Sequence, residues 1–97
     1  MHRRDHELAQ RLARGLAAID PSLVQVARVH TNIVNCFVDR FAADAVTINC
    51  ALKERGVLAN HKRTKIRFVT HYHIDETAVD AAIDRFAAAI EPFRKAA

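Results

Sequence analysis

Glycine, proline and aromatic residues are scarce in this sequence. Among its 97 residues there are two glycines, two prolines, one tyrosine and no tryptophan. With only Gly15 and Gly56, the chain has no glycine-rich loop to cradle a phosphate group, which excludes the Walker motif. A nucleophile elbow and a paired-carboxylate signature are also missing, so no complete active site of another kind is suggested. The lack of low-complexity tracts indicates an ordinary globular domain rather than a disordered tail.

Long apolar runs are missing as well. No run approaches the roughly 20 residues that a membrane span requires, and the first residues lack the apolar centre of a signal peptide. We therefore expect a cytoplasmic protein with no membrane partner. Cys36 and Cys50 do not have the close spacing of a redox or zinc pair, and we expect two reduced, mostly buried thiols.

The composition that remains describes one small domain with a positive charge. Hydrophobic residues make up 51% of the chain, charged residues 27%, and the net charge is +4. We expect a single domain over residues 1–97 with one core. Basic residues of the first helix alternate with acidic ones, and a second basic group falls in a turn near residues 62–65. Because single-strand-binding proteins combine basic grooves with stacking aromatics, which do not accompany these charges, we do not expect a nucleic-acid partner.

Hydrophobic periodicity predicts an α+β fold with the element order αββαββα. Leu8, Leu12 and Leu16 recur at helical spacing. The segment 24–38 switches to β-branched and aromatic residues, with a break at residues 31–32 between two strands. The sheet is expected to be small and mostly antiparallel, with the helices packed on one face. The expected elements are a helix over 5–19, two strands within 24–38, a helix over 45–55, strands over 57–59 and 65–70, and a final helix after residue 75.

Turn and cap residues set the expected boundaries. Asp44 is a candidate N-cap for the second helix, and Gly56 is its left-handed C-terminal residue. Asp75 begins the last helix, and Pro92 bends or ends it. The polar tract 60–64 predicts a hairpin, which makes the strands on either side of it antiparallel neighbours.

The strand around residue 35 is largely apolar on both faces. Ile33, Asn35 and Phe37 point one way, while Val34 and Cys36 point the other way. A sheet covered by helices on one side alone should show cleaner alternation of apolar and polar residues. We therefore expect the second face to meet another domain or subunit, as in a homo-oligomer.

Three segments carry a resemblance to a known family: residues 31–34 (TNIV), 52–57 (LKERGV) and 66–71 (IRFVTH). Their order and spacing resemble the C-terminal small domain of the low-specificity L-threonine aldolases, which are β-eliminating lyases that use pyridoxal phosphate. The resemblance covers most of the chain. It implies that the Schiff-base lysine, the phosphate cradle and the partner of the pyridine nitrogen belong to a large upstream domain that nothing here resembles. We therefore expect pyridoxal phosphate in the complete enzyme, none bound to this chain, and no catalysis by this chain alone.

Arg67 is the first candidate for a functional residue. The resemblance implies that it holds the α-carboxylate of the amino-acid substrate. A planar guanidinium can do so with two parallel hydrogen bonds, where a lysine offers only a point charge. The alternative is an edge-strand arginine that lies over apolar surface with its head in water. Asn32 and His71 are weaker candidates for substrate binding, since an amide that begins a strand usually satisfies a local turn.

Three histidines raise the question of a metal. His71 and His73 would project from the same side of a strand, and His61 across the hairpin could complete a zinc site. The resemblance implies an acidic residue in place of His73 in many family members, and histidines beside a sheet end are usually hydrogen-bonded or solvated. We expect no metal site.

Two functional hypotheses follow. In the first, the chain is the C-terminal domain of a lyase of the threonine aldolase type, which cleaves β-hydroxy amino acids to glycine and an aldehyde. Its partners would be the amino-acid substrate and the upstream domain. In the second, it is a stand-alone αβ binding or oligomerisation module without catalytic activity.

Overall fold

The computed structural model describes residues 3–69 and 74–95. The fold belongs to the α+β class, as predicted, with a three-stranded antiparallel sheet in the order β1-β3-β2. The elements along the chain are α1 (Arg3–Ile19), the 3-10 helix η1 (Val26–Arg28), β1 (Ile33–Phe37), α2 (Ala45–Glu54), β2 (Asn60–Lys62), β3 (Lys65–Val69), α3 (Glu76–Ile90) and the 3-10 helix η2 (Glu91–Phe93).

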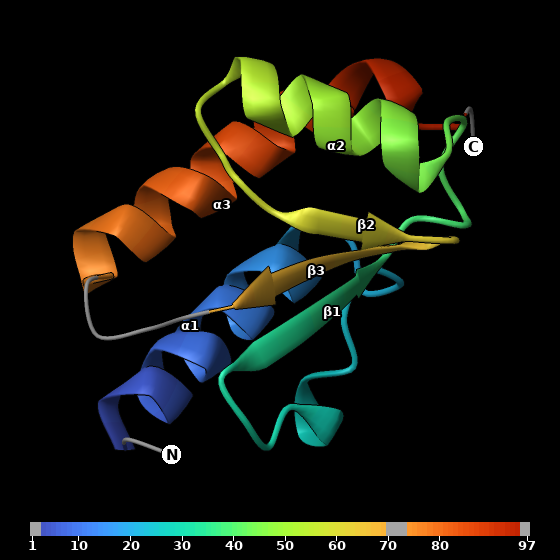
Figure 1. The fold of residues 1–97 in the computed structure, drawn as a ribbon. Coiled ribbons are helices and arrows are strands. Elements are labelled where there is room, and N and C mark those ends of the chain that lie inside the picture. Colours follow the sequence, from blue (N-terminus) through green and yellow to red (C-terminus); the bar gives the residue numbers. More distant parts are fainter. Residues whose placement is uncertain (1–2, 70–73, 96–97) are drawn as a thin grey trace.

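The three α-helices pack on one face of the sheet, as expected (Figure 1). The alternation of buried and exposed side chains along the strands explains this one-sided packing, because successive side chains of a strand point to opposite faces of the sheet. Val34 and Cys36 of β1 and Ile66 and Phe68 of β3 are buried in the core that the helices share. The opposite face, called the open face below, carries Ile33, Asn35 and Phe37 of β1, Asn60 and Lys62 of β2, and Lys65, Arg67 and Val69 of β3.

Helix α1 buries the predicted leucine stripe. Leu8, Leu12 and Leu16 are buried, as are Ala9 and Ala13. None of the helices in the part of the chain that the structure describes is long and apolar enough to cross a bilayer.

The helix boundaries follow the predicted caps. The side chain of Asp44 accepts a hydrogen bond from the Thr47 N–H at 2.8 Å, and that of Asp75 accepts one from the Ala78 N–H at 2.8 Å. The Thr47 bond holds the pKa of Asp44 below its ordinary value. Gly56 ends the second helix at φ 81°.

The strand predicted between residue 24 and the break at 31–32 is wrong, because this segment follows α1 instead of pairing with the sheet. Val24 and Val29 are buried core anchors on either side of η1. The Val29 carbonyl accepts a hydrogen bond from the Gln10 side chain of α1. β-branched residues here indicate burial, and only tertiary contacts decide whether such a segment becomes a strand.

The strand predicted over 57–59 is also wrong, because Val57 completes the end of α2. Its N–H donates to the Leu52 carbonyl at 2.9 Å. The pairing with β3 begins three residues later, and Lys62 lies opposite Lys65 across a tight turn in which Arg63 has φ 56°. β2 therefore consists of three exposed polar residues, and their hydrophobicity pattern did not predict a strand.

The two thiols have different environments, which corrects the expectation that both are mostly buried. Cys36 is completely buried under the sheet, and this burial raises the pKa of its thiol well above the ordinary value. Cys50 is exposed. It lies two residues from both Ile48 and Leu52, which point into the core, so the helical turn carries Cys50 outward.

Candidate anion-binding site

Arg67 lies in the middle of β3, the central strand of the sheet. It is directly opposite Asn35 of β1 and Asn60 of β2. Residues that are directly opposite in antiparallel strands project from the same face. The exposed guanidinium of Arg67 therefore stands on the open face with an amide side chain on the strand at either side.

The open face is polar at its centre, around Arg67, and carries an exposed apolar residue at each end of the β1–β3 pair. Phe37 is 38% exposed and Val69 is 44% exposed, and they occupy opposite ends of the β1–β3 pair. Arg67 lies between them on β3, and Lys65 is directly opposite Phe37 at one end. The sequence indicated an apolar second face for β1 alone, and β2 and β3 add cations to that face of the sheet. That another domain or subunit covers this face stays a prediction.

A hollow of about 490 Å³ lies over this centre and gathers cations from three segments of the chain. Lys62 and Lys65 are directly opposite each other, and like charges in such a pair are destabilising. None of the lining residues is acidic, so an anion entering the hollow would meet only positive and neutral side chains. This basic hollow is lined by Arg28, His30, Thr31, Ile33, Asn35, Lys62, Lys65 and Arg67.

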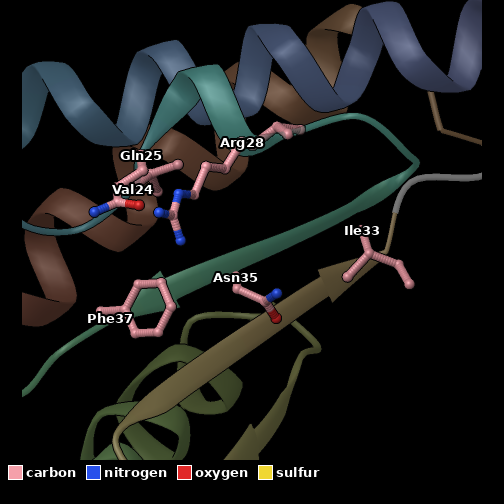
Figure 2. Close-up of a pocket in the computed structure, with 7 residues that line it drawn as sticks. Val24, Gln25, Arg28, Ile33, Asn35 and Phe37 are labelled. Carbon is pink, nitrogen blue, oxygen red and sulfur yellow. The ribbon is translucent and has the colours of Figure 1, made fainter.

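A second hollow of about 200 Å³ continues the first one toward η1, since the two share Arg28, Ile33 and Asn35. Figure 2 shows the Arg28 side chain reaching from η1 toward β1, on the side where Asn35 and Phe37 project. Arg28 thus closes one side of a depression that runs along the open face.

The Arg67 side chain makes no hydrogen bond or ion pair within residues 3–69 and 74–95. Some other arginines of the fold are paired. Arg11 donates to both carboxylate oxygens of Asp80 at 2.8 Å, and Arg94 donates to Glu91 at 2.9 Å. The guanidinium of Arg67 can therefore donate two parallel hydrogen bonds to an incoming carboxylate or phosphate.

Asn32 is not among the residues that line the hollow around Arg67. Asn32 is half-buried in the bend before β1, where the Thr31 hydroxyl accepts a hydrogen bond from the Ile33 N–H at 3.1 Å. This bond stabilises the turn in which Asn32 lies. His71 lies outside the described residues, and its part in a site stays a prediction.

The zinc hypothesis is also left open. His61 is exposed on β2, while His71 and His73 lie outside the described residues. Among residues 3–69 and 74–95, no group of three His, Cys, Asp or Glu side chains could hold a metal ion.

The described residues do not fit a pyridoxal phosphate site. Gly15 is packed beneath Ile83 inside the helix layer, and Gly56 ends α2, so neither opens a loop for a phosphate group. A Schiff-base lysine needs a site that sets its basicity and surrounds the cofactor. The lysines are instead exposed or half-buried at the surface: Lys53, Lys62, Lys65 and Lys95.

Arg28, Asn35, Lys62 and Lys65 join Arg67 in the folded chain, although the sequence did not single them out as site residues. One signal was available for Asn35, because it is the polar residue inside the apolar run of β1. Nothing in the sequence marks Arg28, which reaches the hollow only because η1 folds back beside β1.

No protein-family model matches the chain, and neither does any curated protein. The family resemblance therefore depends on the three segments 31–34, 52–57 and 66–71.

Proposed function

We propose that this chain is the C-terminal small domain of a pyridoxal-phosphate-dependent lyase of the threonine aldolase type, and that Arg67 holds the α-carboxylate of the amino-acid substrate. The reaction class is retro-aldol cleavage of a β-hydroxy amino acid to glycine and an aldehyde. The resemblance of the segments 31–34, 52–57 and 66–71 supports this proposal. We also propose a cytoplasmic location, where free thiols such as Cys50 stay reduced, and a homo-oligomeric enzyme.

The placement of Arg67 is the observation that carries the proposal. The guanidinium projects from the central strand, and no carboxylate of the described residues occupies it. A substrate carboxylate can take two parallel hydrogen bonds from it. The strand fixes the backbone on both sides, so the arginine is presented from a rigid element, which is what precise orientation of a substrate requires.

The neighbouring amides support this role. Asn35 and Asn60 lie opposite Arg67 on either side, and each amide offers two N–H donors. They can hydrogen-bond to the carboxylate that Arg67 holds and limit its rotation. The described residues of this chain do not fit the cofactor, so the chain contributes only to substrate binding. An upstream domain would hold the cofactor, which would supply the electron sink for bond cleavage.

A split-enzyme assay tests the proposal. The large domain of a threonine aldolase, produced without its own small domain, is mixed with this chain, and acetaldehyde release from L-threonine is measured. We expect the chain to restore activity. Arg67→Lys should lower kcat/KM by about 10- to 100-fold, because it removes charge-assisted hydrogen bonds and keeps the positive charge.

Arg63→Lys is the matched control, since Arg63 lies in the exposed turn beside β3. It should leave the restored activity unchanged. If Arg63→Lys and Arg67→Lys lower the rate equally, the role of Arg67 is refuted. If the large domain binds the chain and no aldehyde appears, the lyase assignment is refuted, and the stand-alone module becomes the better description.

A further inference from the structure

The basic hollow carries more positive charge than one amino-acid carboxylate would neutralise. Arg28, Lys62, Lys65 and Arg67 all line it, and a single carboxylate occupies one guanidinium. The other three cations remain, and the repulsion between the facing residues Lys62 and Lys65 remains with them. A ligand with several anionic groups in a row would relieve that repulsion.

We propose that the open face of this chain binds single-stranded nucleic acid, with its phosphates in the basic hollow and a base against Phe37. This inference does not depend on the proposed function, because it concerns binding by the chain on its own. It assigns roles to Arg28, Lys62 and Lys65, which the carboxylate-holding role of Arg67 does not use.

The folded arrangement changes both reasons for not expecting nucleic acid. In the sequence, Arg28 is more than thirty residues away from Lys62, and the fold brings them to one hollow. An aromatic side chain also accompanies the charges, since Phe37 is directly opposite Lys65 and 38% exposed. A basic groove beside an exposed ring on a sheet is the combination that binds single strands, in which bases stack on aromatic faces.

An acidic protein surface would also neutralise the positive charge of the basic hollow, but it would give no role to Phe37 and Asn35. Phe37 lines the second hollow together with Arg28, and this is the place that the proposal gives to a base. Asn35 lies between the two hollows and can donate to or accept from a base edge. Carboxylate side chains need neither a stacking surface nor an amide at this place.

Binding can be measured by fluorescence anisotropy with the full chain and a labelled single-stranded RNA of about 12 nucleotides. The dissociation constant is determined at salt concentrations from about 20 to about 200 mM. Release of counterions by four cations gives a slope of about −2.8 when the logarithm of the association constant, the reciprocal of the dissociation constant, is plotted against log salt for a single strand. The double variant Arg28→Glu/Lys65→Glu should bind at least about tenfold more weakly, with a slope of about −1.4 or shallower.

The control removes the same charge from the helix side of the molecule. Arg14 and Lys53 are exposed on α1 and α2, and Arg14→Glu/Lys53→Glu changes the net charge by the same amount. It should keep most of the affinity and the slope of the original chain. Phe37→Leu tests stacking, and it should weaken binding about fivefold or more, whereas Leu58→Ala, at another exposed apolar residue, should have no effect.

Three results would overturn the proposal. The first is no binding at the lowest salt. The second is an equal loss of affinity in the two double variants, which would show attraction by net charge without a site. The third is competition by poly-glutamate as strong as by unlabelled RNA at equal charge, which would point to an acidic protein partner. Circular dichroism of each variant confirms that it is folded before its binding is compared.

Discussion

Gly15 of α1 lies directly beneath the side chain of Ile83 of α3. A Cβ added at residue 15 would lie 2.9 Å from the Ile83 Cγ1 and would also overlap its Cδ1. The two helices can therefore pack at this distance only because residue 15 has no side chain. The glycine is retained inside a helix although it costs about 1 kcal/mol of helix propensity relative to alanine.

We predict that Gly15→Ala destabilises the chain by about 1 to 3 kcal/mol, because overpacking outweighs the gain in helix propensity. Urea unfolding followed by circular dichroism measures the change. The double variant Gly15→Ala/Ile83→Ala should be less destabilised than the sum of the single variants by more than about 1 kcal/mol. Simple additivity of the two changes would contradict the steric explanation.

The ion pair between Arg11 and Asp80 should make stability depend on acid pH. The hydrogen bond from Arg11 lowers the pKa of Asp80 below its ordinary value. A carboxyl group with a lowered pKa in the folded state contributes stability above its unfolded pKa, and this contribution disappears as the pH falls through the folded value. The difference in unfolding free energy between the original chain and Asp80→Asn should therefore be present at neutral pH, shrink below about pH 4 and vanish in stronger acid.

Asp84→Asn serves as the comparison for this titration, because Asp84 is exposed about one turn further along α3 and forms no ion pair within the described residues. It should show a much smaller change over the same pH range. Added salt should also reduce the Asp80 effect, since both partners of the pair are about half exposed. An effect of Asp80→Asn that is constant from neutral pH to strong acid would rule out the charge as its cause.

The two cysteines should differ sharply in reactivity toward a thiol reagent. Cys50 is exposed, whereas Cys36 is fully buried and burial raises its pKa, so its reactive thiolate is suppressed. We predict that one thiol per native chain reacts rapidly with Ellman's reagent and that the second reacts only as the chain unfolds. Cys50→Ser should abolish the rapid phase. A rapid phase that persists in Cys50→Ser would show that Cys36 is accessible in the native state.

Local signals in the sequence were sufficient for the helices and their ends. Leu8, Leu12 and Leu16 gave the buried stripe of α1, and the caps at Asp44 and Asp75 gave the starts of α2 and α3. Caps work this way because the orphan N–H groups of a helix are satisfied within a few residues of its start. The strand β3 was found within one residue for a similar reason, since its alternation is regular over residues 65–69.

Strand pairing was harder to predict from the sequence, because it depends on residues that are distant along the chain. Val24 and Val29 have strand-like side chains. The Gln10 side chain of α1 nevertheless donates a hydrogen bond to the Val29 carbonyl, and the residues between the two valines form η1. Residues 60–62 have no apolar pattern, yet a neighbouring strand makes them β2. β propensity reports how well a side chain suits a half-buried surface. It cannot say whether the fold provides a neighbouring strand or a helix at that place.

For function, the sequence by itself determined the chemistry that Arg67 can perform, and it carries the resemblance on which the proposed function depends. A guanidinium binds carboxylate or phosphate wherever it is placed, and the resemblance over the segments 31–34, 52–57 and 66–71 is read from the sequence alone. Only the tertiary structure decided what surrounds it. The sheet sets Asn35 and Asn60 beside Arg67, and the return of η1 brings Arg28 to the same hollow. Those positions are fixed by strand register and by burial of the segment against α1, which are properties of the whole fold and of no single segment.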